Sequence, residues 1–186
     1  MLNAVKRGAL AAAATITLAS VAGAQGRPLE MGLDAGVVFG LGDQSSVDIT
    51  LPASRARVGF FLADTRWSIE PALGLSYTKV EDTDGIFTYD VELGALYHLR
   101  PFIVATADEN EVIARVNAPY VRPFVGFTGF TGGDTDDNEF SVGAGLGIKI
   151  PWRRQIAWRL EANAGYGFSN DAFRLGALAG FSFFTR

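Results

Sequence analysis

The feature that most constrains the fold is a two-residue alternation between large apolar side chains and small or polar ones. The segment 158–166 carries Trp158, Leu160, Ala162, Ala164 and Tyr166 at one set of positions, and Arg159, Glu161, Asn163 and Gly165 between them. A period of two is that of a β-strand, whose successive side chains point to opposite faces. Large apolar groups on one face, with glycines and charges on the other, are typical of a strand between lipid and a narrow lumen.

The same pattern recurs along the chain. It is found in segments 31–39, 55–62, 67–77, 87–98, 121–128, 139–150 and 173–183. Together with 158–166 this makes eight segments, an even number, and most have the roughly 9–11 residues that a tilted membrane-spanning strand needs. The sequence therefore predicts an all-β fold, an eight-stranded antiparallel up-and-down transmembrane β-barrel.

The first residues have the pattern of a secretory signal peptide. Lys6 and Arg7 precede an alanine-rich apolar stretch, and Ala22-Gly23-Ala24 is a small-x-small cleavage site. We therefore expect residues 1–24 to be removed and residues 25–186 to form one outer-membrane barrel domain.

The connections between the segments also alternate in character. Residues 63–66 and 151–155 are short, as periplasmic turns are, whereas 41–54, 81–85 and 132–138 are polar and acidic, as outer loops are. Tryptophans fall at the short-turn end and other aromatics at the opposite end, as in two interfacial girdles. The first set is Trp67, Trp152 and Trp158, and the second is Tyr77, Phe87, Phe130, Phe140, Phe168 and Phe173.

The segment 100–118 lies outside this pattern. Its short apolar stretches, 103–105 and 112–116, flank an acidic centre. This favours a hairpin extension of the fourth and fifth strands below the membrane, and a short helix over 109–116 is the alternative. Neither stretch is long enough to span a bilayer, so the expected number of strands stays at eight.

These features resemble the small eight-stranded outer-membrane barrels of the OmpA-transmembrane-domain, OmpX and opacity-protein kind. The C-terminal run Arg174-x-Gly176-x-x-Ala179-x-Phe181 is similar to the signal that the barrel-assembly machinery reads in that family. Members commonly end on an aromatic residue, whereas two residues follow Phe184 here. The resemblance implies a monomer in the bacterial outer membrane, surrounded by outer-membrane lipid and lipopolysaccharide. It also implies periplasmic chaperones and the assembly machinery as partners during biogenesis. Unlike the full two-domain OmpA type, this chain is expected to be a bare barrel without a peptidoglycan-binding domain.

The inward face of the predicted strands carries six acidic and six basic residues. They are Asp34, Arg55, Arg57, Glu70, Asp90, Glu92, Arg122, Glu139, Lys149, Arg159, Glu161 and Arg174. Equal numbers are expected because an unpaired buried charge costs several kcal/mol. We interpret the set as a charge network that fills the lumen, and a gated ion path is the alternative.

Neither catalysis nor cofactor binding is expected. The chain has no cysteine and a single histidine, His98, at the short-turn end of its strand. Outer-membrane enzymes of similar architecture use a histidine near the outer leaflet or the cell surface.

Asp43 and the stretches 81–84 and 134–139 carry oxygen ligands suited to Ca²⁺ or Mg²⁺. Solvated acidic loops are the simpler interpretation, and the net charge of −4 argues against a nucleic-acid partner.

Three functions fit the pattern. The first is a barrel with a plugged polar lumen and a structural or surface-contact role. The second is a narrow pore for ions or small solutes. The third is a secreted lipocalin-like carrier, which also has eight up-and-down strands but would have to expose its glycine-rich face to water.

The assigned faces give a first prediction. Leu160→Arg puts a charge on the lipid side near the bilayer midplane, and we expect it to lower the free energy of unfolding by about 2–4 kcal/mol. Ser141→Arg, on the lumen side, should instead fail through steric overfilling and charge imbalance. Urea unfolding in lipid measures both effects, and normal folding of Leu160→Arg in detergent and in lipid would reverse the assignment of the two faces.

Overall fold

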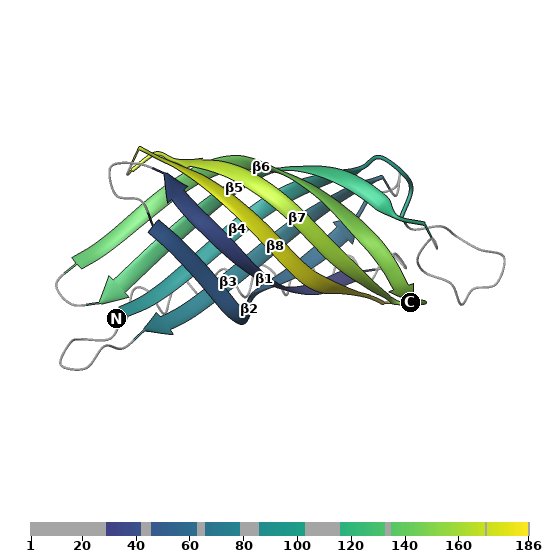
Figure 1. Ribbon diagram of the computed structural model, residues 1–186, viewed down its shortest axis with the longest axis horizontal. Helices are drawn as coiled ribbons and strands as arrows, with labels where there is room; N and C mark the ends of the chain where they lie inside the picture. The colour runs from purple at the N-terminus through teal and green to yellow at the C-terminus, as the bar shows by residue number, and fades with distance from the viewer. Residues whose placement is uncertain are drawn as a thin grey trace.

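The computed structural model describes residues 29–41, 46–62, 66–78, 86–102, 116–132, 135–169 and 171–185. These residues form eight strands: β1 (Leu29–Leu41), β2 (Ser46–Phe61), β3 (Trp67–Thr78), β4 (Ile86–His98), β5 (Ala118–Gly132), β6 (Thr135–Arg153), β7 (Ile156–Gly167) and β8 (Ala172–Phe184). Each strand pairs antiparallel with its neighbour in sequence, and the strands form one closed barrel (Figure 1). The predicted fold class and the number of strands are therefore confirmed.

Pairing between the first and last strands closes the barrel. The register runs from Glu30 opposite Phe184 to Leu41 opposite Phe173. Closure leaves no edge strand with unpaired backbone groups, which is a condition for a sheet that lies in lipid. Among the described residues, no helix is long and apolar enough to cross a membrane.

Several strands are longer than the alternation predicted. β2 begins at Ser46, so most of the predicted loop 41–54 is strand, and β6 takes residues from both the predicted loop 132–138 and the predicted turn 151–155. β5 likewise begins at Ala118, the last residue of the segment 100–118. The reason is that ladder hydrogen bonds depend on the backbone and not on apolar side chains. Alternation marks only the part of each strand that faces lipid, and pairing continues beyond it.

Some expectations fall on residues outside the described ranges. The signal peptide 1–24 is among them, as are Asp43, the stretch 81–84 and the part of the segment 100–118 from residue 103 to 115. The hairpin and the helix considered for that segment therefore stay predictions.

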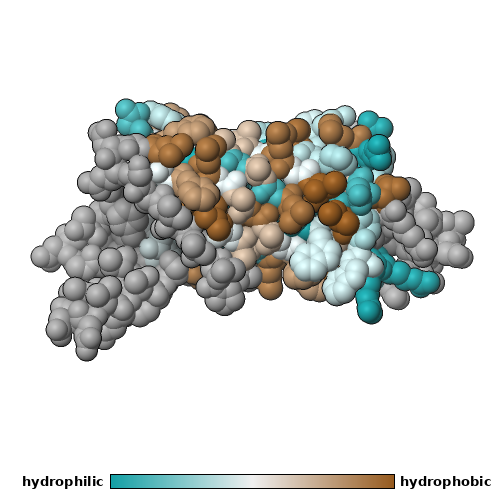
Figure 2. Space-filling model, viewed as in Figure 1, coloured by the Kyte–Doolittle hydropathy of each residue, from teal (hydrophilic) through white to brown (hydrophobic). Residues whose placement is uncertain are grey.

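The distribution of side chains is the inverse of that in a water-soluble barrel. On the outer wall, Leu33, Leu93 and Leu146 are exposed, Leu146 to 67% of its surface. Arg122 and Glu70, on the inner face, are completely buried. Figure 2 shows apolar side chains across the middle of the face that β7, β8 and β1 present to the viewer in Figure 1. A soluble carrier would need the opposite arrangement.

Glycines on the inner face make room for large inward side chains on the neighbouring strand. Tyr120 of β5 lies opposite Gly147 of β6, and a Cβ atom at Gly147 would overlap the Tyr120 ring. Arg57 has the same relation to Gly32. The alternating glycines of β6 are therefore explained by close packing across the inner face.

This packing predicts that Gly147→Ala lowers the free energy of unfolding by about 1–3 kcal/mol, because the buried Tyr120 ring has to shift. Gly165→Ala is the control, since its Cβ would lie 3.4 Å from the nearest atom, the carbonyl oxygen of Val142. Urea unfolding of both refolded variants measures the difference. Equal stability of the two variants would contradict the packing argument.

Candidate functional site: the charged interior

Arg57 is the centre of the first group of buried charges. It donates from Nη1 to Glu30 Oε1 at 2.6 Å and to Glu70 Oε2 at 3.3 Å, and from Nε to Asp34 Oδ2 at 2.8 Å. Its Nη2 donates to the Ser182 hydroxyl at 2.8 Å. Strands β1, β2, β3 and β8 thus meet at one guanidinium, which uses its fixed fork of donors on three carboxylates.

Arg159 of β7 is the centre of the second group. Its Nη1 donates to both oxygens of Glu70, at 2.7 and 2.6 Å, and its Nη2 donates to Glu161 at 2.6 Å. Its Nε donates to the Tyr120 hydroxyl at 2.7 Å, and that hydroxyl donates to Glu161 at 2.7 Å. Glu70 therefore joins the two arginine centres.

Further pairs extend these groups into one chain of alternating sign. Arg122 pairs with Glu161 at 2.6 Å and with Glu92, and Glu92 also pairs with Arg55. At the other side, Lys149 pairs with Glu30. The order is Lys149, Glu30, Arg57, Glu70, Arg159, Glu161, Arg122, Glu92 and Arg55. Each carboxylate in this chain lies between two cations.

The remaining predicted residues lie closer to the end of the barrel where β1 is joined to β2, β3 to β4 and β5 to β6, here called the long-loop end after the predicted outer loops. The strand bounds leave only residues 42–45, 79–85 and 133–134 between these strands, and the longest connection, 99–117, joins β4 to β5 at the opposite, short-turn end, so the predicted difference in loop length between the two ends is wrong. Glu139 pairs with Arg174, whose side chain is 35% exposed. Asp90 accepts a hydrogen bond from the Thr128 hydroxyl at 3.0 Å. All twelve residues singled out in the sequence thus lie on the inner face. Eight of them are members of the chain of alternating sign, and a ninth, Asp34, is joined to it through Arg57.

Two central members were missed by the sequence analysis. Glu30 is completely buried and contacts Arg57, Lys149 and Ser182. It adds a seventh acid to a set predicted to balance six against six. The signal was present, because Glu30 is in phase with Gly32 and Asp34. Tyr120 is in phase with Arg122 in the same way, but large aromatic groups were expected only outside.

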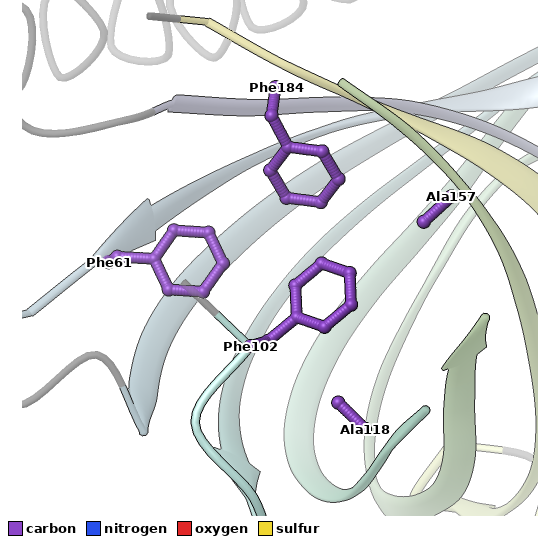
Figure 3. Packing of buried hydrophobic residues seen from close by; sticks show 5 residues of the cluster. All are labelled: Phe61, Phe102, Ala118, Ala157 and Phe184. Carbon is purple, nitrogen blue, oxygen red and sulfur yellow. The ribbon is translucent and has the colours of Figure 1, made fainter. Parts of the chain in front are cut away.

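The short-turn end of the interior is apolar. Phe61, Phe102, Ala118, Ala157 and Phe184, here called the terminal aromatic cluster, are all buried, and their three rings converge (Figure 3). The centres of the Phe102 and Phe184 rings are 5.3 Å apart. Phe102 follows β4 and belongs to no strand, so a residue from outside the barrel wall is enclosed by it. The inner face was predicted to carry only glycine, small polar and charged groups, and at this end of the barrel that prediction is wrong.

The terminal aromatic cluster is in contact with two polar side chains of the inner face, Lys149 and His98. Lys149 Nζ lies 5.5 Å from the centre of the Phe61 ring and 5.7 Å from that of Phe102. The His98 ring stacks on Phe61 at 5.6 Å, and its Nδ1 lies 3.0 Å from the Arg66 carbonyl oxygen. His98 is completely buried. The single histidine of the sequence is thus enclosed at the short-turn end of the barrel.

The outer wall has aromatic groups near both ends. At the short-turn end, Trp152 and Trp158 lie 6.0 Å apart and both contact Phe181, while Trp67 packs on Tyr97 at 4.8 Å. At the other end, the members of the predicted girdle whose side chains the structure describes are Phe140, Phe168 and Phe173, and all three are exposed. The side chains of Tyr77, Phe87 and Phe130 lie outside the described part of the structure.

Metal binding finds no support among the side chains that the structure describes. No group of three or more His, Cys, Asp or Glu residues is arranged there to hold a metal ion. Glu139, the last acid of the stretch 134–139, is engaged by Arg174.

Comparisons with known proteins give the fold. No family model and no curated protein matches the sequence. Among solved structures, the chain is similar to Neisserial surface protein A (TM-score 0.57, 11% identity, 83% of this chain and 96% of that one). It is also similar to two Pseudomonas aeruginosa proteins. The first is the N-terminal β-barrel domain of OprF, with a TM-score of 0.50 and 17% identity over 84% of this chain and 98% of that one. The second is the outer membrane protein OprG, with a TM-score of 0.50 and 12% identity over 86% of this chain and 95% of that one. These similarities agree with the closed eight-stranded barrel described above, and the apolar outer wall is that of a barrel surrounded by lipid.

The network predicts a large difference between its centre and its rim. Arg159→Met leaves Glu70 and Glu161 short of a buried partner, and we expect the free energy of unfolding to fall by about 3–5 kcal/mol. Arg174→Gln removes a partly exposed partner, and the cost should be about 1 kcal/mol because water can reach the site. Urea unfolding in lipid measures both variants. Equal losses of unfolding free energy would show that the central pairs contribute no more to stability than the pair at the rim.

Proposed function

We propose that the protein is an integral barrel of the bacterial outer membrane with a plugged polar lumen and a structural or surface-contact role. The observation that carries this proposal is the continuous chain of paired charges from Lys149 to Arg55. Its central side chains, those of Arg57, Glu70 and Arg159, have at most 1% of their surface exposed.

A conducting lumen is not favoured by this arrangement. The interior of an eight-stranded barrel is just wide enough for its own side chains. Passing ions would have to displace pairs such as Arg159–Glu70, and breaking a buried pair costs about 3–5 kcal/mol. The terminal aromatic cluster adds a second, apolar obstruction at the short-turn end. A narrow pore is therefore the weaker candidate.

A carrier and an enzyme are supported less. A carrier would bind its ligand in an apolar cavity, but the inner face here carries arginines and carboxylates. Catalysis on outer-leaflet lipid would need a base near the long-loop end, and His98 is enclosed at the other end. We assign no cofactor and no catalytic residue.

The remaining partners follow from the proposed location. The short-turn end would face the periplasm, and the long-loop end would meet lipopolysaccharide and any surface partner. On β8, Arg174 and Gly176 lie on the inner face, and Ala179 and Phe181 on the outer one. We propose that the assembly machinery reads this strand after the periplasmic chaperones deliver the chain, and that the barrel acts as a monomer.

Two measurements on the refolded mature protein test the proposal. A compact band on a gel, lost on boiling, is expected for a closed membrane barrel. In planar bilayers we expect no discrete conductance steps, with a sixteen-stranded porin as the positive control. Salt-dependent steps would overturn the plugged lumen, and good solubility without detergent, with no shift on boiling, would overturn the membrane barrel.

A further inference from the structure

The outer wall carries an open apolar groove across β1, β8, β7 and β6. Its volume is about 760 Å³. The register places its outward residues in two rows, the first being Ala35, Ala179, Leu160 and Ile148, and the second Val37, Ala177, Ala162 and Leu146. Alanines form the floor on β1, β8 and β7, and the larger Leu160 and Leu146 form one side. The wall is thus hollowed near the middle of these strands.

The short-turn end of the same strands is aromatic and cationic. The next row below the groove contains Trp158 opposite Phe181, with ring centres 3.9 Å apart, and Trp152 packs on both. Beyond this row, Arg153 and Arg154 are exposed at the turn between β6 and β7. The Arg153 guanidinium lies 5.7 Å from the centre of the Trp152 ring.

We propose that this face binds one anionic phospholipid of the periplasmic leaflet. The phosphate would lie at Arg153 and Arg154, because guanidinium groups bind phosphate through paired hydrogen bonds. The glycerol region would lie on Trp152 and Trp158, which suit the membrane interface. One acyl chain would follow the wall into the groove.

The dimensions agree with this occupant. The register pairs Arg153 with Ile156, and the groove residues of β7, Leu160 and Ala162, lie four and six residues further along that strand. At about 3.4 Å per residue and a tilt of about 40°, this places the two rows of the groove roughly 10 and 15 Å deeper than Arg153. One leaflet of a bilayer has a hydrocarbon depth of about 15 Å, half of the 30 Å core. A chain anchored at Arg153 and Arg154 therefore ends where the groove is.

Charge complementarity favours an anionic headgroup over a zwitterionic one. Among the described residues of the short-turn end, the exposed charged side chains are Arg66, Arg100, Arg153 and Arg154. Arg66 and Arg100 flank β3 and β4, on the other side of the barrel from the groove. They provide a matched control with the same change in charge.

The test is quenching of tryptophan fluorescence by brominated lipids, in a Trp67→Phe background in which Trp152 and Trp158 report. We expect brominated phosphatidylglycerol to bind about five- to tenfold better than brominated phosphatidylcholine. The double variant Arg153→Gln, Arg154→Gln should lose this preference, and the double variant Arg66→Gln, Arg100→Gln should keep it. Equal losses in the two double variants would mean general surface attraction and would overturn the site.

A second pair of variants tests the groove. Ala177→Leu fills the groove and should weaken binding of the brominated phosphatidylglycerol. Ala56→Leu, at an exposed outward position of β2, should leave this binding unchanged. An equal effect of the two would remove the groove from the proposal. The inference rests on the proposed membrane barrel, so each variant is also checked for the band that is lost on boiling. A normal band without any lipid preference overturns the lipid site alone.

Discussion

The pairing of β8 with β1 is the constraint on which the rest of the structure depends. It turns a sheet with two open edges into a closed wall in which every strand has a paired neighbour on both sides, the only form in which strands are stable in lipid. Closure also creates the interior, because Ser182 of β8 meets Glu30 of β1 and Arg57 of β2 only when the ends of the sheet join. The apolar outer wall and the charged inside are two consequences of the same ring.

The interior resolves a conflict between burial and charge. Arginines and carboxylates are the costliest groups to take out of water, yet here they fill a space that glycine-rich strands leave narrow. The cost is offset because each carboxylate of the chain meets two cations and several hydrogen-bond donors, as Glu161 does with Arg159, Arg122 and Tyr120. Such a network fixes which strand faces which, since a shift of one strand by one residue would move the inward charges of that strand into lipid.

The eight strands and their faces were predictable from the sequence, because a period of two records directly which side chains meet lipid. The ends of β2 and β6 were not, since polar residues beyond the membrane pair as well as apolar ones do. Individual ion pairs could not be assigned either, because partners such as Glu30 and Lys149 are joined only through closure. Phe102 carries no periodic signal at all, as it lies beyond the end of β4, and the hollow in the wall depends on four strands in register.

The terminal aromatic cluster has a consequence for the order in which the barrel forms. Its rings come from the second strand, from the segment after the fourth and from the last residue of the eighth, Phe184. Phe61 and Phe102 therefore lack their contacts with Phe184 until the last strand, β8, has joined the sheet. Such contacts between distant parts of a chain form late and slowly. The slow step of refolding should thus be the joining of the two ends, and shortening the last strand by its final phenylalanine should delay that step more than it loosens the finished barrel.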